Sequence, residues 1–395
     1  MVLDDEPFTL KLHGHMLAEL GFVSSSHFEA GALALEAIDH GPIPDLILLD
    51  LSMPTMDGIE FIRHLVSRRF AGSLVLVSAE DERLLQTASN LVRAHGMNAL
   101  GHLRKPVKPV HLRALLEDWG AQPTSAIRRP ARAYGADEIR DALSKGEMVN
   151  HYQPKVSLRT GGIVAVETLT RWHHPKDGLV FPARFIETAE RHGLIGELTR
   201  LSFSKALDEM RALERSGFPL RVSINLAAPI LTSVDFADFA SAEAQRASVR
   251  PHDIVLEVTE SQLIQDLRAP LEVLTRLRLM RFSLSIDDFG TGYSSMAQLR
   301  NIPFDELKID QSFVHRSSKD ATARAMYDAS LGLAKQLNMK TVAEGVEDRA
   351  DWDLVQSTDC DEAQGFFIAR AMPASDLLEF RKTWRERARL ELGFA

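Results

Sequence analysis

Short apolar runs alternate with amphipathic stretches of helical length over the first 118 residues. The expected strands are residues 2–5, 45–50, 73–78 and 99–106, and the expected helices are about 10–20, 58–67 and 82–95. Strands separated by helix-length segments predict a parallel sheet with helices on both faces. The first strand pattern is short because acidic residues begin at Asp4. Either this edge of the sheet is clipped, or the true start of the chain lies upstream.

A second alternating series runs from about residue 137 to the C-terminus. Its expected strands are residues 151–158, 163–169, 220–227, 253–260, 282–288, 306–310, 340–347 and 361–368. Helical stretches such as 182–192, 198–216 and 321–337 separate most of them. Eight strands over roughly 260 residues match the size of a TIM-like (β/α)8 barrel. An open doubly wound sheet is the alternative.

Between the two series, residues 119–136 are rich in Pro, Ala, Gly and Arg and have no periodicity, which is typical of a linker. The predicted organisation is therefore a domain at 1–118, a linker at 119–136 and a domain at 137–395. Arg128, Arg129 and Arg132 could contact a nucleotide or RNA. Three arginines in a linker are more often a solvated run.

The composition limits the partners of the chain. Hydrophobic residues make up 45% and charged residues 26%, as in ordinary soluble proteins. The net charge of −9 disfavours nucleic acid and anionic membranes, and no apolar run approaches the roughly 20 residues of a membrane helix. Cys360 is the only cysteine, which excludes an intramolecular disulfide and a Cys-based zinc site. We expect a cytoplasmic protein with no nucleic acid or membrane partner.

Most strands of the second series end in a polar or ionisable side chain. These are Glu167, Asn225, Glu257, Asp287 with Asp288, Lys308, Glu344 and Gln364. Inside a barrel these ends converge on one face. Buried carboxylates without partners are costly, so a cation is expected among them. Because the ligands are oxygens without His or Cys, Mg²⁺ or Mn²⁺ is favoured over zinc.

Asp287 and Asp288 stand side by side at the end of one strand pattern. Successive strand residues face opposite ways, so the two carboxylates serve different partners unless the strand end twists. Two ions about 3.5–4 Å apart would let one carboxylate bridge them. A single acid at a strand end is more often a helix cap, but a series of such ends is not explained that way. Beside cations the pKa of Lys308 would fall, which suits a proton acceptor or a water-orienting group.

The same residues carry a resemblance to a known family. ETLTRW at 167–172 is followed in order by SINLA, EVTES, DDFGTGYSS, LKIDQSF, AEGVE and QGF. From about residue 137 to 373 the chain resembles the EAL-domain phosphodiesterases, which hydrolyse cyclic di-GMP to linear pGpG. Departures from the family pattern are Thr168, Ala227 and Ala371, and none removes a proposed ligand. An active enzyme is expected.

The resemblance implies a role for each polar position. One metal would be held by Glu167, Asn225, Glu257 and Asp287, and a second surrounded by Asp287, Asp288 and Glu344. Lys308 would be the general base or the anchor of the attacking water. Substrate contacts would come from Gln153, Leu169, Arg171, Gln364 and Glu347. Glu260 would anchor the loop at 288–295 in a competent pose.

The first series carries its own constellation at its strand ends, formed by Asp4, Asp5, Asp50, Ser78 and Lys105. Acids, a hydroxyl and a lysine at the ends of a flavodoxin-like (βα)5 sheet suit Mg²⁺ and a phosphoryl group. With MPTMDG after Asp50, these residues resemble a response-regulator receiver domain. That resemblance makes Asp50 the phosphoacceptor, gives Mg²⁺ to Asp4 and Asp5, and has Ser78 and Lys105 read the phosphoryl group. His102 takes the place of the usual aromatic switch residue.

The order receiver then EAL is that of the RocR-type response regulators. We expect a sensor histidine kinase as partner and a homo-oligomer, dimer or tetramer. Phosphorylation of Asp50 would then reposition the 288–295 loop through receiver packing. The alternatives are a non-catalytic cyclic di-GMP receptor and a protein-interaction regulator. No helix-turn-helix, basic patch or GGDEF-type segment is found.

Overall fold

The computed structural model describes residues 1–22, 24–120, 134–263, 268–290, 299 and 301–394. The chain divides into two compact units, residues 1–129 and 130–395. The division falls within the predicted linker, most of which lies outside the described residues, as do its three arginines. Helix α5 ends at Gly120, before this division, and helix α6 begins at Ala136, after it. The predicted domain boundaries themselves stay predictions.

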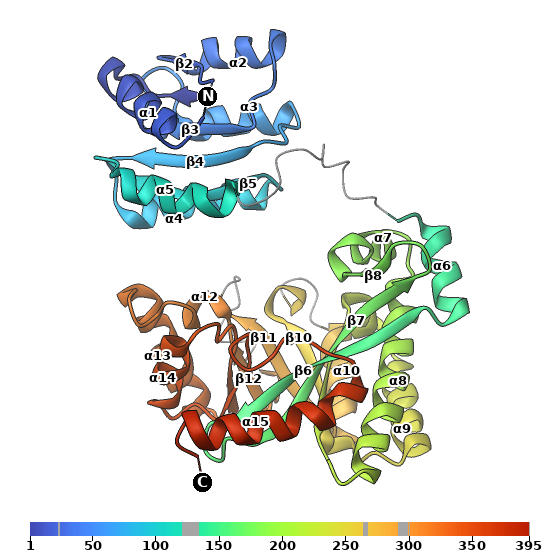
Figure 1. Cartoon of the computed structure of the whole chain (residues 1–395). Coiled ribbons are helices and arrows are strands. Elements are labelled where there is room, and N and C mark those ends of the chain that lie inside the picture. Colours follow the sequence, from blue (N-terminus) through green and yellow to red (C-terminus); the bar gives the residue numbers. More distant parts are fainter. Residues whose placement is uncertain (23, 121–133, 264–267, 291–298, 300, 395) are drawn as a thin grey trace. The chain divides into compact units, whose positions relative to one another are not determined.

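The first unit is a parallel five-stranded sheet in the order β2-β1-β3-β4-β5, which is the flavodoxin-like order (Figure 1). The strands are β1 (Val2–Leu3), β2 (His27–Phe28), β3 (Leu46–Asp50), β4 (Ser73–Ser78) and β5 (Asn98–Arg104). The helices are α1 (Pro7–Glu19), α2 (Gly31–His40), α3 (Gly58–Ser67), α4 (Glu82–Ala94) and α5 (Pro109–Gly120). Apolar side chains of α1 and α5 pack on one face of the sheet, and those of α2, α3 and α4 on the other. The predicted fold is confirmed.

Local sequence explains these elements. Every residue of β3 and β4 is buried, as expected of central strands covered on both faces. Asp57 caps α3 by accepting a hydrogen bond from the Glu60 amide at 2.7 Å, and Asp81 caps α4 in the same way. Since all five strands are parallel, their carboxyl ends meet at one edge.

The second unit is a closed barrel of eight strands with the order β6-β14-β13-β12-β11-β10-β9-β7, in which β7 pairs back to β6. The strands are β6 (Met148–Ser157), β7 (Ile163–His174), β9 (Arg221–Asn225), β10 (Ile254–Thr259), β11 (Ser283–Phe289), β12 (Glu306–Ile309), β13 (Lys340–Ala343) and β14 (Glu362–Ala363). A short strand, β8 (Gly178–Val180), pairs with the far end of β7. The open-sheet alternative is therefore wrong.

The barrel departs from a regular (β/α)8 arrangement in its first strand. β6 runs antiparallel to both of its neighbours, β7 and β14, whereas the other seven strands run parallel. The physical reason is the connection, because a five-residue turn joins β6 to β7 and leaves no room for a crossover helix. The carboxyl ends of the parallel strands still meet at one rim.

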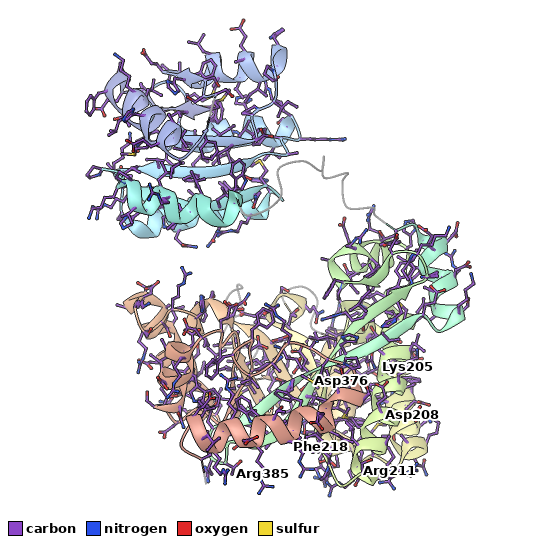
Figure 2. All side chains as sticks on the ribbon, in the orientation of Figure 1. Lys205, Asp208, Arg211, Phe218, Asp376 and Arg385 are labelled. Atoms are coloured by element: carbon purple, nitrogen blue, oxygen red, sulfur yellow. The ribbon has the colours of Figure 1, made fainter. Side chains whose placement is uncertain are left out.

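The outer layer of the barrel is helical. Its helices are α6 (Ala136–Lys145), α7 (Ile186–Arg191), α8 (Ile195–Arg215), α9 (Phe236–Ala247), α10 (Arg268–Leu279), α12 (Gln311–Val314), α13 (Ala321–Gln336), α14 (Arg349–Gln356) and α15 (Leu377–Glu391). Along α8, Phe203 and Leu207 are buried against the strands, whereas Asp208 and Arg211 lie on its outer side (Figure 2). Among the described residues, no helix has the length and apolar character that crossing a membrane requires.

Candidate active site

The ammonium group of Lys308 lies at the centre of the acidic strand ends. Its Nζ is 2.7 Å from Glu344 Oε1, 2.9 Å from Asp287 Oδ1 and 3.0 Å from Glu257 Oε2. Glu167 Oε2 is farther away, at 3.8 Å. The side chain of Lys308 is 1% exposed, so these charges face one another with little water between them. The structure thus gathers acids that are far apart in the sequence around one cation.

Amide groups hold Glu167 in place at the end of β7. Asn225 donates its Nδ2–H to Glu167 Oε1 at 2.9 Å, and Gln364 donates its Nε2–H to Glu167 Oε2 at 2.6 Å. The same Gln364 amide lies 3.1 Å from Gln153 Oε1 on β6. These contacts link β6, β7, β9 and β14 at the rim. Gln364 thus contacts Glu167 and Gln153, and the predicted polar ring, which also includes Glu347, stays a prediction.

The pair Asp287 and Asp288 is brought to one site by a break in the strand. The pairing of β11 with β12 shifts between Ile286 and Phe289, so β11 carries an extra residue there. Asp288 adopts a left-handed backbone with φ of 54°, which is uncommon for a residue other than glycine. As in a β-bulge, the extra residue changes the direction of the Asp288 side chain, which in a regular strand would face the opposite side from Asp287. Carboxylate oxygens of Asp287, Asp288 and Glu344 lie within 4.8 Å of one another.

A second buried lysine extends the charge network into the barrel, and sequence reasoning missed it. Lys155 on β6 is fully buried, with its Nζ 2.6 Å from Glu257 Oε1 and 3.5 Å from Glu306 Oε1. It also donates to Ser223 Oγ at 2.8 Å. The available signal was the alternation of β6, because Gln153 and Lys155 are two residues apart and face the same way.

Burial and neighbouring charges shift the pKa values of the rim carboxyl groups in different directions. Burial and the charge of Asp287 raise the pKa of Asp288 to about 6, and burial raises the pKa of Glu344 to about 8. Burial opposes ionisation of Glu257 as well, but Lys155 and Lys308 lower its pKa to about 2. Burial likewise disfavours the ammonium of Lys308, but the surrounding carboxylates raise its pKa well above the ordinary value. The pKa of Lys308 is therefore raised, whereas a lowered pKa was expected for a lysine beside bound metal ions.

The donor set therefore fits divalent cations. Five carboxylates, those of Glu167, Glu257, Asp287, Asp288 and Glu344, share two ammonium groups, which leaves negative charge without compensation. Hard oxygen ligands of this kind suit Mg²⁺ or Mn²⁺. The pKa values of Asp288 and Glu344 are raised chiefly by burial and also by the charges of neighbouring carboxylates.

A cavity of about 300 Å³ opens over this rim. Its lining includes predicted residues and others that the sequence analysis did not single out. The lining residues are Gln153, Glu167, Leu169, Asp287, Asp288, Lys308, Asp310, Gln311, Glu344, Gly345, Glu347, Gln364, Gly365 and Phe366. Leu169 and Glu347 are among the lining residues, and their contact with a substrate stays a prediction. The exposed ring of Phe366, at 50%, adds an aromatic surface.

Arg171 differs from the other predicted substrate residues because it is not among those that line the cavity. It is 8% exposed, donates to the Thr170 carbonyl at 2.9 Å and lies over the Phe181 ring at 5.0 Å. Its Nε–H has no hydrogen-bond partner among the described residues. Burial lowers the pKa of this guanidinium. Its role toward the substrate stays a prediction.

Glu260 contacts the start of the loop that it was predicted to anchor. In the 3-10 turn η4 (Glu260–Leu263), it is 2% exposed and accepts a hydrogen bond from the Gly290 amide at 2.7 Å. Gly290 has φ of 94°, and a Cβ added there would lie 2.5 Å from the Phe313 ring. Residues 291–298, the remainder of the predicted loop, lie outside the described residues.

The first unit also brings its predicted residues together. Lys105 Nζ lies 2.6 Å from Asp50 Oδ2 and 2.9 Å from Asp4 Oδ2. Oxygens of Asp4, Asp5 and Asp50 lie within 4.8 Å of one another. Asp50 is 2% exposed and accepts a hydrogen bond from the Ser52 amide at 3.0 Å. Burial raises the pKa of Asp4, although the nearby ammonium of Lys105 acts in the opposite direction.

Two hydroxyls complete this acidic edge. Ser78 Oγ is 3.1 Å from Ser52 Oγ and accepts a hydrogen bond from the Glu80 amide at 3.2 Å.

His102 lies at the predicted switch position on β5. Its Nδ1 is 3.2 Å from Ser89 Oγ on α4. An imidazole that contacts a hydroxyl thus stands where the family resemblance predicts an aromatic switch residue.

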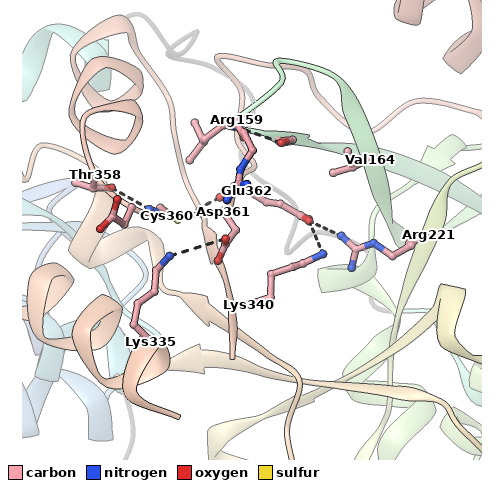
Figure 3. Close-up of a pocket in the computed structure, with 12 residues that line it drawn as sticks. Arg159, Val164, Arg221, Lys335, Lys340, Thr358, Cys360, Asp361 and Glu362 are labelled. Carbon is pink, nitrogen blue, oxygen red and sulfur yellow. Dashed lines mark hydrogen bonds and ion pairs between the residues drawn. The ribbon is translucent and has the colours of Figure 1, made fainter. Parts of the chain in front are cut away.

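A larger hollow, of about 480 Å³, lies at the opposite end of the barrel (Figure 3). Arg221 begins β9 and Lys340 begins β13, and both point toward Glu362, with Lys340 Nζ at 3.1 Å. The predicted site residues are not among those that line it. Because this is the amino end of the parallel strands, the ion pairs there are expected to support stability.

Comparison with known proteins identifies both domains. The EAL domain family matches residues 136–371, and the response regulator receiver domain matches residues 1–117. The chain is 33% identical over 384 residues to the cyclic di-GMP phosphodiesterase RocR of Pseudomonas aeruginosa, covering 96% of this chain and 97% of that protein. It is 38% identical over 242 residues to the bifunctional diguanylate cyclase/cyclic di-GMP phosphodiesterase MucR of the same organism, covering 61% of this chain and 35% of that protein.

Solved structures give the same assignment for the barrel. The PaMucR phosphodiesterase in complex with c-di-GMP matches with a TM-score of 0.58 and 38% identity, covering 61% of this chain and 98% of that one. An EAL domain protein from Listeria monocytogenes matches with a TM-score of 0.56 and 26% identity, covering 63% and 98%. The chain therefore belongs to the EAL domain family and carries a response regulator receiver domain at its N-terminal end.

Proposed function

We propose that this chain is a response regulator that hydrolyses one phosphodiester bond of cyclic di-GMP to give 5′-pGpG. The observation that carries the proposal is the buried ammonium of Lys308 among four carboxylates, at the floor of a cavity that opens at the barrel rim. The relative that matches almost the whole chain is a cyclic di-GMP phosphodiesterase, which supports the same substrate.

Divalent cations are part of this proposal. Glu167, Asn225, Glu257 and Asp287 would hold one Mg²⁺ or Mn²⁺, and Asp287, Asp288 and Glu344 would surround a second. Such ions lower the pKa of water and offset the negative charge that develops on a phosphoryl group. The proximity of the Asp287, Asp288 and Glu344 oxygens supports this arrangement.

The chain's own residues then have distinct tasks. Asn225 and Gln364 fix the carboxylate of Glu167 by donating to its two oxygens. Lys308 keeps the acids together, and its positive charge suits attraction of a phosphate oxygen or of the attacking water. Leu169 and Phe366 offer apolar surface for a base at the cavity wall. Together they position a dinucleotide over the acidic rim.

The direct test is hydrolysis of cyclic di-GMP by the full-length chain with Mg²⁺ or Mn²⁺, with and without EDTA. We expect metal-dependent formation of pGpG, and a loss of about 10²–10³-fold in turnover for Glu167→Ala, as for removal of one key electrostatic group. Glu187→Ala, at an exposed position of α7, is the matched control and should keep full activity. Tight binding without product would favour the non-catalytic receptor instead.

Regulation through the first unit is the second part of the proposal. A sensor kinase would phosphorylate Asp50, with Asp4 and Asp5 holding Mg²⁺ and Ser78 and Lys105 contacting the phosphoryl group. The added charge of about −1.5 to −2 would disturb the Lys105 ion pairs. Homo-oligomer formation, the 288–295 loop as the responding element, and protein-interaction partners stay predictions.

Treatment with a small phosphodonor such as acetyl phosphate should change the turnover or the oligomeric state of the wild type. Asp50→Asn removes the acceptor carboxylate and should abolish that response, while Asp57→Asn, on an exposed helix cap, should leave it intact. Turnover is followed by pGpG release and oligomeric state by light scattering. Identical responses of wild type and Asp50→Asn would contradict a role for Asp50.

A further inference from the structure

A buried carboxylate outside the acidic rim ties together two loops of the substrate cavity. Asp351, in the first turn of α14, is 1% exposed and receives three hydrogen bonds. His315 Nδ1 lies 2.8 Å from its Oδ2, the Arg316 amide donates to Oδ1 at 2.9 Å, and the Glu347 amide donates to Oδ2 at 3.1 Å. Asp351 therefore joins the segment after β12 to the loop after β13.

The hydrogen bond to Asp351 determines that Nδ1 of the His315 ring carries a proton. Burial opposes ionisation of Asp351, but the hydrogen bonds from His315 and the two backbone amides keep its pKa below the ordinary value. An ionised carboxylate can only accept, so the Nδ1 of His315 must carry a proton. The buried acid thus fixes the orientation of the imidazole and points its Nε2 edge in one direction.

The backbone next to His315 adopts an uncommon conformation that a hydrogen bond to Asp351 stabilises. Arg316 has φ of 61°, in the left-handed region, which costs about 1–2 kcal/mol for a residue with a side chain. The hydrogen bond from its amide to Asp351 offsets that cost. The position of His315 is therefore set by the fold and not only by its own side-chain rotamer.

The other edge of the imidazole faces Glu347. His315 Nε2 is 3.8 Å from Glu347 Oε2, and Glu347 lines the substrate cavity together with Gln311 and Phe366. This is an ion-pair distance and is longer than a hydrogen bond. The ring attracts both carboxylates only as the imidazolium, in which both nitrogens carry protons. Glu347 is not among the carboxylates that contact Lys308. Because a carboxylate repels phosphate and accepts hydrogen bonds, its complementary groups on a guanine dinucleotide are the N–H donors of the base.

We propose that His315, held by Asp351 between two carboxylates as an imidazolium, is a positioning residue that attracts the carboxylate of Glu347 and orients it for contact with a guanine base. The proposal rests on cyclic di-GMP being the substrate. His315 itself is not among the residues that line the cavity, so it acts through Glu347. The arrangement is an acid, an imidazole and an acid in series, with only the last reaching the substrate.

A metal site at the same place is the competing interpretation. Ligand atoms of His315, Asp348 and Asp351 lie within 4.8 Å of one another. However, Asp348 Oδ1 accepts from the Asp351 amide at 2.9 Å as the cap of α14, and both oxygens of Asp351 already have donors. Hydrogen bonding within the protein accounts for this cluster.

The test is steady-state hydrolysis of cyclic di-GMP by the full chain and its variants. His315→Ala and Glu347→Gln should each raise KM about 5–20-fold with kcat within about twofold, since binding and not chemistry is weakened. The double variant should be no worse than Glu347→Gln, because both changes remove the same contact. His252→Ala, an exposed histidine elsewhere on the barrel, is the control and should leave KM unchanged.

His315→Asn separates positioning from folding. Its side-chain amide can still donate to Asp351, so its melting temperature should match the wild type, while KM should rise as in His315→Ala. Additive losses in the double variant, a normal KM for His315→Asn, or a fall in kcat alone would overturn the inference. If the wild type does not hydrolyse cyclic di-GMP, the proposed function fails first and the inference fails with it.

Discussion

Lys308→Ala should lower the turnover of cyclic di-GMP by about 10³-fold or more, within the range for loss of a positioned proton-transfer group. The substitution removes the ammonium that lies within 3.0 Å of Glu257, Asp287 and Glu344. The three carboxylates would then repel one another in a buried site, and no positive charge of residue 308 would remain to attract a phosphate oxygen or the attacking water. Release of pGpG under substrate saturation measures the effect.

Lys319→Ala is the matched control, because that lysine is exposed and follows the same strand after a short helical turn. It should retain wild-type turnover. The affinity of Lys308→Ala for cyclic di-GMP, measured by calorimetry, should fall far less than its turnover. If Lys308→Ala kept more than about a tenth of wild-type turnover, the assignment of Lys308 to the chemistry would be wrong.

The second large effect concerns stability. Lys155→Met should lower the free energy of unfolding of the barrel by about 3–5 kcal/mol, as for breaking a buried ion pair from one side. Lys155 is fully buried, and its loss leaves Glu257 and Glu306 without the ammonium at 2.6 Å and 3.5 Å. Urea denaturation followed by tryptophan fluorescence reports on the barrel, which holds Trp172, Trp352 and Trp384.

Lys382→Met provides the comparison for this change. The Lys382 side chain is 74% exposed and pairs only with Glu379 of the same helix among the described contacts, so its loss should cost under about 0.5 kcal/mol. Equal stability of the two variants would show that the charges of Glu257 and Glu306 do not depend on Lys155.

Much of the fold follows from hydrophobic patterning, and the exceptions have physical causes. β3 and β4 are continuous buried runs that are easily recognised. β2 has only two residues, so it and the following α2 were not expected. The antiparallel direction of β6 was also missed, because periodicity reports which residues are buried and not the direction of a strand.

The acidic rim could be predicted because its residues share one position, the end of a strand. Lys155 is an interior residue of β6, two positions before its last residue, so a search of strand ends does not find it. The bulge that turns Asp288 into the site depends on pairing with β12 and is not encoded locally. His315 and Asp351 are 36 residues apart and meet only because β12 and β13 are neighbours. Such contacts require the tertiary structure.

We propose that divalent cations hold the scattered acids at one rim, and anomalous diffraction from a crystal soaked in Mn²⁺ would detect them. We expect a manganese peak bounded by Glu167, Asn225, Glu257 and Asp287, and a second beside Asp288 and Glu344. The absence of any peak between Glu167 and Asp287, in crystals whose site is open to solvent, would contradict it.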